Sequence, residues 1–84
     1  MSYRVEVTRG ARKQLSRLHP ESRERIMEAI DALADTPYPR DSRKLQGREG
    51  YRIRVGSYRA LYRVDEDQRE VTVFLIAHRR EVYR

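Results

Sequence analysis

Basic side chains in the second half of the chain are spaced so that several of them face the same way. Residues 51–55 read Tyr-Arg-Ile-Arg-Val, in which arginine alternates with apolar residues. Successive side chains of a β-strand point to opposite faces of its sheet, so Arg52 and Arg54 share one face. We expect Arg59, on the strand that returns after Gly56-Ser57, to join them. The pattern predicts a cluster of guanidinium groups on one face of a sheet.

The end of the sequence adds groups that can move a proton or stabilise charge. Residues 78–84 read HRREVYR and supply His78, Arg79, Arg80 and Tyr83. Histidine changes charge near neutral pH, and nearby cations favour the phenolate form of a tyrosine, which can then act as a base. One preorganised donor aimed at developing negative charge is worth about 3–4 kcal/mol. These residue types suit cleavage of an RNA phosphodiester by its own 2′-hydroxyl, without a metal ion.

The positive charge is concentrated in one segment. The 84 residues carry a net charge of +6, and residues 40–63 hold eight cations against two anions, which accounts for the whole excess. A localised excess is typical of a surface that binds a polyanion. Of 19 basic residues 17 are arginine, which grips phosphate and stacks on bases, although a GC-rich genome produces the same bias. Besides the strand arginines, the candidates for RNA binding are Arg40, Arg43, Lys44, Arg48 and Arg63.

Several kinds of site and location are disfavoured by composition. The chain has no cysteine, and its two histidines stand alone, so we expect neither a metal site nor a cofactor. No serine lies in a nucleophile elbow. The longest apolar stretch, residues 71–77, is too short to span a membrane, and the N-terminus lacks a signal-peptide core. We expect a cytoplasmic protein.

Periodicity in the first half predicts a strand followed by two helices. Residues 3–7 alternate between apolar and charged side chains, as in a half-buried strand. Residues 8–18 place apolar side chains at helical spacing, with Thr8 as the N-cap, and the helix must end near His19 because Pro20 follows. Proline suits the first turn of the next helix, which continues to the proline-rich loop at residues 35–39.

The second half returns to the period of strands. Residues 51–55 and 58–64 predict a hairpin around Gly56-Ser57, and the continuously apolar residues 71–77 predict a central strand. The resulting order is βααβββ, an α+β fold with a helical hairpin on one face of a largely antiparallel, four-stranded sheet. We expect residues 1–84 to form a single domain.

These features together resemble a known family. The run KLQGREGYRIRVGSYRALYRVDEDQREVTVFLIAHRREVYR, residues 44–84, resembles the C-terminal half of toxins in the RelE/ParE superfamily, and the order of elements matches that fold. The RelE branch is the closest fit. The resemblance implies a ribosome-dependent endoribonuclease that cuts mRNA on the ribosome, where the enzyme contacts both the mRNA and rRNA. It also implies a RelB-like antitoxin that neutralises the toxin in a hetero-oligomer.

The resemblance also implies roles for single residues. Arg52 and Arg54 match a basic pair that binds and activates the RNA substrate. Arg59, together with a later arginine that is either Arg79 or Arg80, matches the group that holds the scissile phosphate. Tyr83 matches a tyrosine that acts as base or orients the nucleophile.

Two departures from the family pattern change these roles. Some relatives carry lysine in the basic pair, and because arginine does not lose its proton, the role of Arg52 and Arg54 narrows to electrostatics. The segment before Tyr83 is shorter than in some relatives, which leaves the choice between Arg79 and Arg80 open. It also brings His78 close enough to share the role of general acid or base.

Two other functions fit the same sequence. A ParE-type inhibitor of DNA gyrase would share the fold and cut no RNA, since one scaffold can host unrelated functions. A non-catalytic RNA-binding module would bind RNA with a steep salt dependence and leave it whole. The alternating arginines taken alone are also typical of a solvated strand face.

Overall fold

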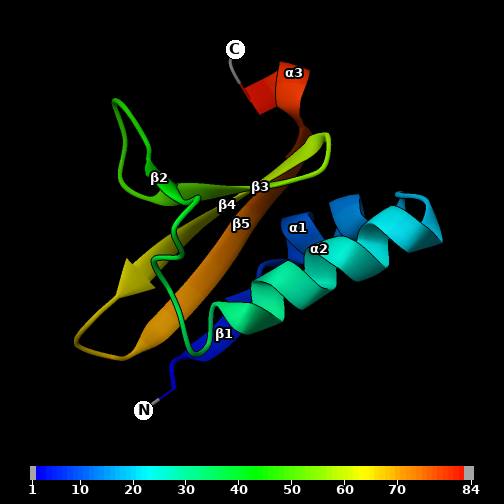
Figure 1. Ribbon diagram of the computed structural model, residues 1–84. Coiled ribbons are helices and arrows are strands. Elements are labelled where there is room, and N and C mark those ends of the chain that lie inside the picture. Colours follow the sequence, from blue (N-terminus) through cyan, green and yellow to red (C-terminus); the bar gives the residue numbers. More distant parts are fainter. Residues whose placement is uncertain (1, 83–84) are drawn as a thin grey trace.

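The computed structural model describes the backbone of residues 2–82 and the side chains of residues 2–80 (Figure 1). The predicted order βααβββ is confirmed, and two short elements, β2 and α3, are added to it. In chain order the elements are β1 (Arg4–Val7), α1 (Arg9–Ser16), α2 (Pro20–Ala32), β2 (Arg43–Lys44), β3 (Tyr51–Val55), β4 (Tyr58–Asp65), β5 (Glu70–His78) and α3 (Arg79–Val82).

The sheet has five strands in the order β1-β5-β4-β3-β2. Within the described residues, the neighbouring strands β1 and β5 pair in parallel, and the three other neighbouring pairs are antiparallel, in keeping with the largely antiparallel sheet that the sequence predicts. The fifth strand is the two-residue β2 at one edge. Helices α1 and α2 lie on one side of the sheet, and we call the other side the open face (Figure 1). In the described part of the chain, no helix combines the length and apolar character needed to cross a membrane.

Local capping explains where the helices begin. The hydroxyl of Thr8 accepts a hydrogen bond from the Ala11 amide at 3.2 Å, which confirms the predicted N-cap of α1. His19 caps α2, because its Nδ1 accepts from the Glu21 amide at 3.2 Å, while Pro20 occupies the first turn. The caps fix the boundary between the two helices at the predicted His19-Pro20 step.

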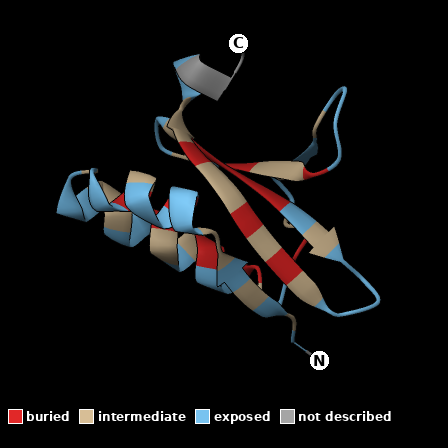
Figure 2. Ribbon diagram, turned by 180° about the vertical axis from the view of Figure 1, so that it is seen from behind, coloured by how far each residue is buried: buried red, intermediate tan, exposed pale blue. Residues whose placement is uncertain are grey.

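The core lies between the helices and the sheet (Figure 2). Its buried members come from both helices, from Leu33 just after α2, and from β3, β4 and β5. They include most of the predicted helix stripes, while Leu18, Tyr51 and Val55 are partly buried against them. The buried members are Ala11, Leu15, Ile26, Ile30, Leu33, Ile53, Ala60, Tyr62, Val71, Val73 and Ile76. Because Ile53 and Ala60 point into this core, their neighbours Arg52, Arg54 and Arg59 must point to the open face.

A β-bulge redirects two apolar side chains of β5. Leu61 pairs with Leu75 while Tyr62 pairs with Val73, so Phe74 is an extra residue without a direct partner. Val73 and Ile76 both lie in the core, which leaves the two residues between them, Phe74 and Leu75, on the open face. The strict alternation of a regular strand would have sent one of them to the core.

Phenol groups hold the loop that leads into β2. The Tyr62 hydroxyl donates to the Pro37 carbonyl at 2.7 Å, and burial raises the pKa of Tyr62 to about 12. Tyr38 donates to one oxygen of Glu66, and Tyr3 donates to the other at 2.6 Å. These two hydrogen bonds hold the pKa of Glu66 below its usual value. The loop is thereby fixed at Pro37 and Tyr38, a few residues before it enters the site.

Candidate functional site

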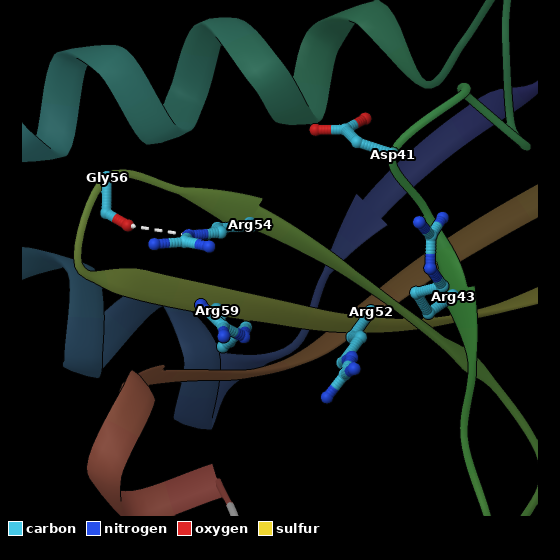
Figure 3. Close-up of a pocket in the computed structure, with 6 residues that line it drawn as sticks. All are labelled: Asp41, Arg43, Arg52, Arg54, Gly56 and Arg59. Atoms are coloured by element: carbon cyan, nitrogen blue, oxygen red, sulfur yellow. Dashed lines mark hydrogen bonds between the residues drawn. The ribbon is translucent and has the colours of Figure 1, made fainter.

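A pocket of about 620 Å³ lies where three strands bring arginines together (Figure 3). Arg54 pairs directly with Arg59 across β3 and β4, and Arg43 pairs directly with Arg52 across β2 and β3. Directly opposed residues project from the same face, so the register gathers all four guanidinium groups. We call this the arginine pocket; its lining residues are Asp41, Arg43, Arg52, Arg54, Gly56 and Arg59.

The four arginines differ in how far solvent reaches them. Arg59 is 8% exposed, Arg52 is intermediate, and Arg43 and Arg54 are exposed. Arg59 is paired on its other side with Ala77, whose small side chain leaves room beside the guanidinium. Like charges directly opposite each other destabilise a sheet, and burying a charge has a cost of its own. An anion in the pocket would relieve both effects.

Asp41 is a lining residue that the sequence did not predict. Figure 3 shows its carboxylate at the far end of the pocket from Arg54 and Arg59, directed toward α2. It was missed because the two-residue β2, which places Asp41 and Arg43 beside β3, is too short to show a period. The charge summed over the pocket residues remains strongly positive, with four arginines against one carboxylate.

The structure separates His78 from the arginine pocket, although the sequence predicted one cleft for both. His78 pairs with Tyr58, one position along from the pair of Arg59 and Ala77, and therefore projects from the helix side of the sheet. There its ring meets the Tyr58 ring edge-on at 5.7 Å and lines a different cavity of about 360 Å³, beside α1. Its Nδ1 accepts from the Arg80 amide at 3.3 Å, which makes His78 a cap for α3.

The later arginines and the tyrosine lie at the end of β5. The Arg79 amide donates to the Ser57 carbonyl at 2.8 Å and holds the start of α3 against the β3–β4 turn. Arg79 and Arg80 are exposed, and neither is among the described residues that line the arginine pocket. Tyr83 lies outside the described residues, so its position relative to the pocket remains a prediction.

The other predicted RNA-binding residues are spread over the surface. Arg43 lines the pocket, whereas Arg40 is exposed in the loop before β2. Lys44 pairs with Tyr51 and so projects to the face opposite Arg43. Arg48 and Arg63 both lie over the ring of Phe74, with their guanidinium carbons 5.1 and 4.5 Å from its centroid. In the described residues, no three His, Asp or Glu side chains are placed to bind one metal ion.

The fold and the pocket define a small α+β protein whose sheet gathers arginines in one concave site. A family model described as the ParE toxin of the type II toxin-antitoxin system, parDE, matches residues 5–83. The chain belongs to this RelE/ParE family of type II toxins.

Relatives within the family carry RelE-type names. The chain is 33% identical over 92 residues to toxin RelG of Mycobacterium tuberculosis, an alignment that covers 100% of this chain and 99% of the relative. It is 32% identical over 88 residues to the protein named RelE1 in Methanocaldococcus jannaschii, covering 100% of this chain and 98% of that protein. The resemblance to RelE toxins is confirmed.

Solved structures of RelE toxins have the same fold. The crystal structure of the archaeal RelE-RelB complex from Pyrococcus horikoshii matches with a TM-score of 0.84 and 32% identity, over 94% of this chain and 97% of that one. The toxin-antitoxin complex RelBE2 of Mycobacterium tuberculosis also gives a TM-score of 0.84, with 28% identity over 93% and 99% of the two chains. The isolated E. coli RelE toxin gives 0.79 and 25%, over 98% and 92%.

Proposed function

We propose that this toxin is an endoribonuclease that cuts mRNA on the translating ribosome. The observation that carries the proposal is the arginine pocket, in which β2, β3 and β4 contribute four guanidinium groups. Guanidinium groups bind phosphate through paired donors and contribute most where negative charge develops. The RelE-type names of the relatives place the chain among toxins of this branch. Ribosomes place the reaction in the cytoplasm, and residues 1–84 act as one domain.

The cleavage reaction needs charge stabilisation more than any other contribution. The 2′-oxygen forms a bond to phosphorus while the bond to the 5′-oxygen breaks, which yields a 2′,3′-cyclic phosphate and a free 5′-hydroxyl. The 2′-hydroxyl gives up a proton, the leaving oxygen gains one, and the phosphate carries extra negative charge in between. Arg54 and the buried Arg59, directly paired across two strands, form the part of the pocket suited to that charge.

Proton transfer is assigned to a residue outside the pocket's arginines. A guanidinium group remains protonated, so Arg52 and Arg54 act only through their charge and hydrogen bonds. Tyr83 is proposed as the base or as the group that orients the 2′-hydroxyl, with Arg79 or Arg80 as a further phosphate ligand. His78 faces the helix side of the sheet and is not assigned a direct step.

A RelB-like antitoxin is proposed to neutralise the toxin. Several of the similar solved structures are complexes of a RelE toxin with its RelB antitoxin. The net charge of +6 suits an acidic, amphipathic segment that folds on binding, and the toxin and antitoxin would then form a hetero-oligomer.

The test is to express the toxin and follow translation and mRNA integrity together. We expect growth arrest with mRNA cut within translated regions, and we expect Arg59→Ala to lose most of that cleavage. Tyr83→Phe should lower the rate while leaving the thermal midpoint unchanged. Arg17→Ala, an exposed arginine on the helix side, is the control for loss of one positive charge. Growth arrest with intact transcripts would show that the toxin is not a nuclease.

The alternative is a ParE-type inhibitor of DNA gyrase, since the matching family model is described by the ParE name. The RelE names of the relatives and the four clustered arginines favour RNA instead. The two functions differ in the response of the cell: gyrase inhibition induces the DNA-damage response, and mRNA cleavage stops protein synthesis first.

A further inference from the structure

Phe74 and two arginines form a second feature on the open face. The bulge in β5 directs Phe74 to this face, and the guanidinium carbons of Arg63 and Arg48 lie 4.5 and 5.1 Å from its ring centroid. Both arginines are exposed, and in the described residues neither forms a hydrogen bond or an ion pair. We call these three residues the Phe74 cluster.

The phenyl ring holds flexible side chains in place. Phe74 packs at the base of residues 45–50, where a Cβ on Gly50 would lie 3.6 Å from the ring atom Cε2 and 3.1 Å from Leu45 Cδ1. A guanidinium over an aromatic face gains about 0.5–1 kcal/mol at an exposed site. Each guanidinium group is planar, so the side that does not contact Phe74 can contact a ligand. Nucleobases stack on guanidinium planes as they do on aromatic rings. The cluster therefore presents planar cations already held in position.

The cluster lies on the same face of β4 as the arginine pocket. Arg59 and Arg63 are four residues apart on β4, so their Cα atoms are separated by about 13 Å. Leu61 lies between them on this face, is 3% exposed, and pairs with Arg52 of β3 and Leu75 of β5, so β4 places no acidic side chain between the two arginines. A few unstacked nucleotides of single-stranded RNA span that distance.

Carboxylates mark the end of this track beyond the cluster. A cavity of about 350 Å³ beside Arg63 is lined by four acidic residues: Glu49, Asp65, Glu66 and Glu70. These side chains repel an RNA backbone, so a strand that starts in the arginine pocket is not carried past Arg63. The Phe74 cluster is thus the last favourable position in this direction.

We propose that the Phe74 cluster is a base-stacking subsite for single-stranded RNA, a few nucleotides along the strand from the phosphate that is cut. The proposal rests on the nuclease activity proposed above. It adds a site at which one base of the RNA stacks on the protein. Arg48 and Arg63 contact the RNA, and Phe74 is a positioning residue that holds their planes. Stacking is sequence-tolerant, so the subsite acts on substrate alignment with little preference among bases.

The experiment is cleavage of mRNA on programmed ribosomes, with one abasic nucleotide moved step by step along the message. We expect wild-type cleavage to fall by about 5- to 100-fold when the missing base is the one that stacks on the cluster. The double variant R48K/R63K keeps both charges and loses the planar groups. It should cleave the normal message more slowly by a similar factor and lose its sensitivity to that abasic position. Phe74→Leu should give a smaller change of the same kind.

The matched control is Arg69→Lys. Arg69 also lies over an aromatic ring, that of Tyr3 at 5.3 Å, but it follows the acidic turn away from the cluster. This variant should retain the wild-type response to every abasic position. Circular dichroism of each variant checks that the fold is retained.

Three outcomes would overturn the proposal. If R48K/R63K responds to the abasic scan like the wild type, the arginines act through charge alone. If the double variant cleaves normally but binds its antitoxin less tightly, the cluster is a protein-binding surface. If the wild type leaves all messages intact while Arg59→Ala is equally toxic, the nuclease function itself is wrong, and the subsite falls with it.

Discussion

Arg54→Gln should make the toxin more stable and less active at the same time. Arg54 lies directly opposite Arg59, with a Cβ separation of about 5.5 Å in such a pair. In water, two unit charges at that distance repel by about 0.8 kcal/mol, which is the largest gain that we expect, because the charges lie at the ends of two long side chains and salt screens exposed charges. The Nε of Arg54 donates a hydrogen bond to the Gly56 carbonyl at 3.5 Å, which is long and exposed, so its loss costs little.

The thermal midpoint and the cleavage rate give the two readouts. For a domain of this size, 0.8 kcal/mol corresponds to about 3–6 °C in Tm, so the rise should not exceed that range. Loss of one preorganised donor should lower the rate of mRNA cleavage by about 100- to 1000-fold. The matched control is Arg63→Gln, on the neighbouring strand β4 and the same face, where the directly opposed residue of β5 is Thr72. It removes no like-charge pair, so its Tm should stay level or fall slightly as the contact with Phe74 is lost.

Salt separates repulsion from other causes of a higher Tm. Raising the ionic strength from 0.15 M to 1 M shortens the Debye length from about 8 to 3 Å, so most of the gain should disappear. If Arg54→Gln lowers Tm in low salt, or if its gain is the same in 1 M salt, the pair does not carry the repulsion that the register implies.

Three further predictions test the structure around the site. Gly50→Ala should lower Tm by about 10 °C, because φ is +129° and the new Cβ would lie 2.9 Å from the Tyr62 carbonyl oxygen; Gly10→Ala, with open space around it, should raise Tm slightly. Asp41→Asn should tighten RNA binding severalfold in a titration at low salt, since it removes the carboxylate of the arginine pocket. Because folding lowers the pKa of Glu66, this carboxylate stabilises the fold at pH values above the pKa of the unfolded chain, about 4.3, and its contribution is lost as pH falls through the lower pKa of the folded state. Urea unfolding from pH 6 to 2 should show this loss of stability. The Glu66→Gln variant should lack this part of the pH dependence.

Most of the fold follows from two periods in the sequence. Helical spacing in the first half and alternation in residues 51–64 were strong enough to predict the helices and the hairpin, and proline and threonine fixed their ends. The two-residue β2 was missed because it depends on contact with β3, for which its own sequence has no signal. The bulge at Phe74 was missed for a related reason: it is a property of the pairing between β4 and β5, and an apolar run reads the same in either register.

The same distinction applies to the site. Side chains alternate between the two faces of a strand, and this alternation was enough to place Arg52 and Arg54 on one face. Because the turn after β3 is tight, the alternation continues into β4 and also places Arg59 on that face. His78 was expected beside them because its place in the sequence is close to Arg79, Arg80 and Tyr83. Its true face depends on whether β4 residue 58 or 59 pairs with it, and a shift by one residue reverses the answer.

Every cationic residue of the arginine pocket is an arginine, which restricts how the cleavage rate can depend on pH. Since a guanidinium group stays protonated throughout the range in which proteins are folded, the charge that Arg43, Arg52, Arg54 and Arg59 offer to a phosphate does not vary with pH. A lysine pair would add proton transfer of its own. Any rise of the cleavage rate with pH must therefore come from the group that accepts the 2′-proton, and if that group is Tyr83, the rise should vanish in Tyr83→Phe while the low-pH rate stays. A pH profile that keeps its shape in Tyr83→Phe would assign the base elsewhere and leave the tyrosine a role in orientation alone.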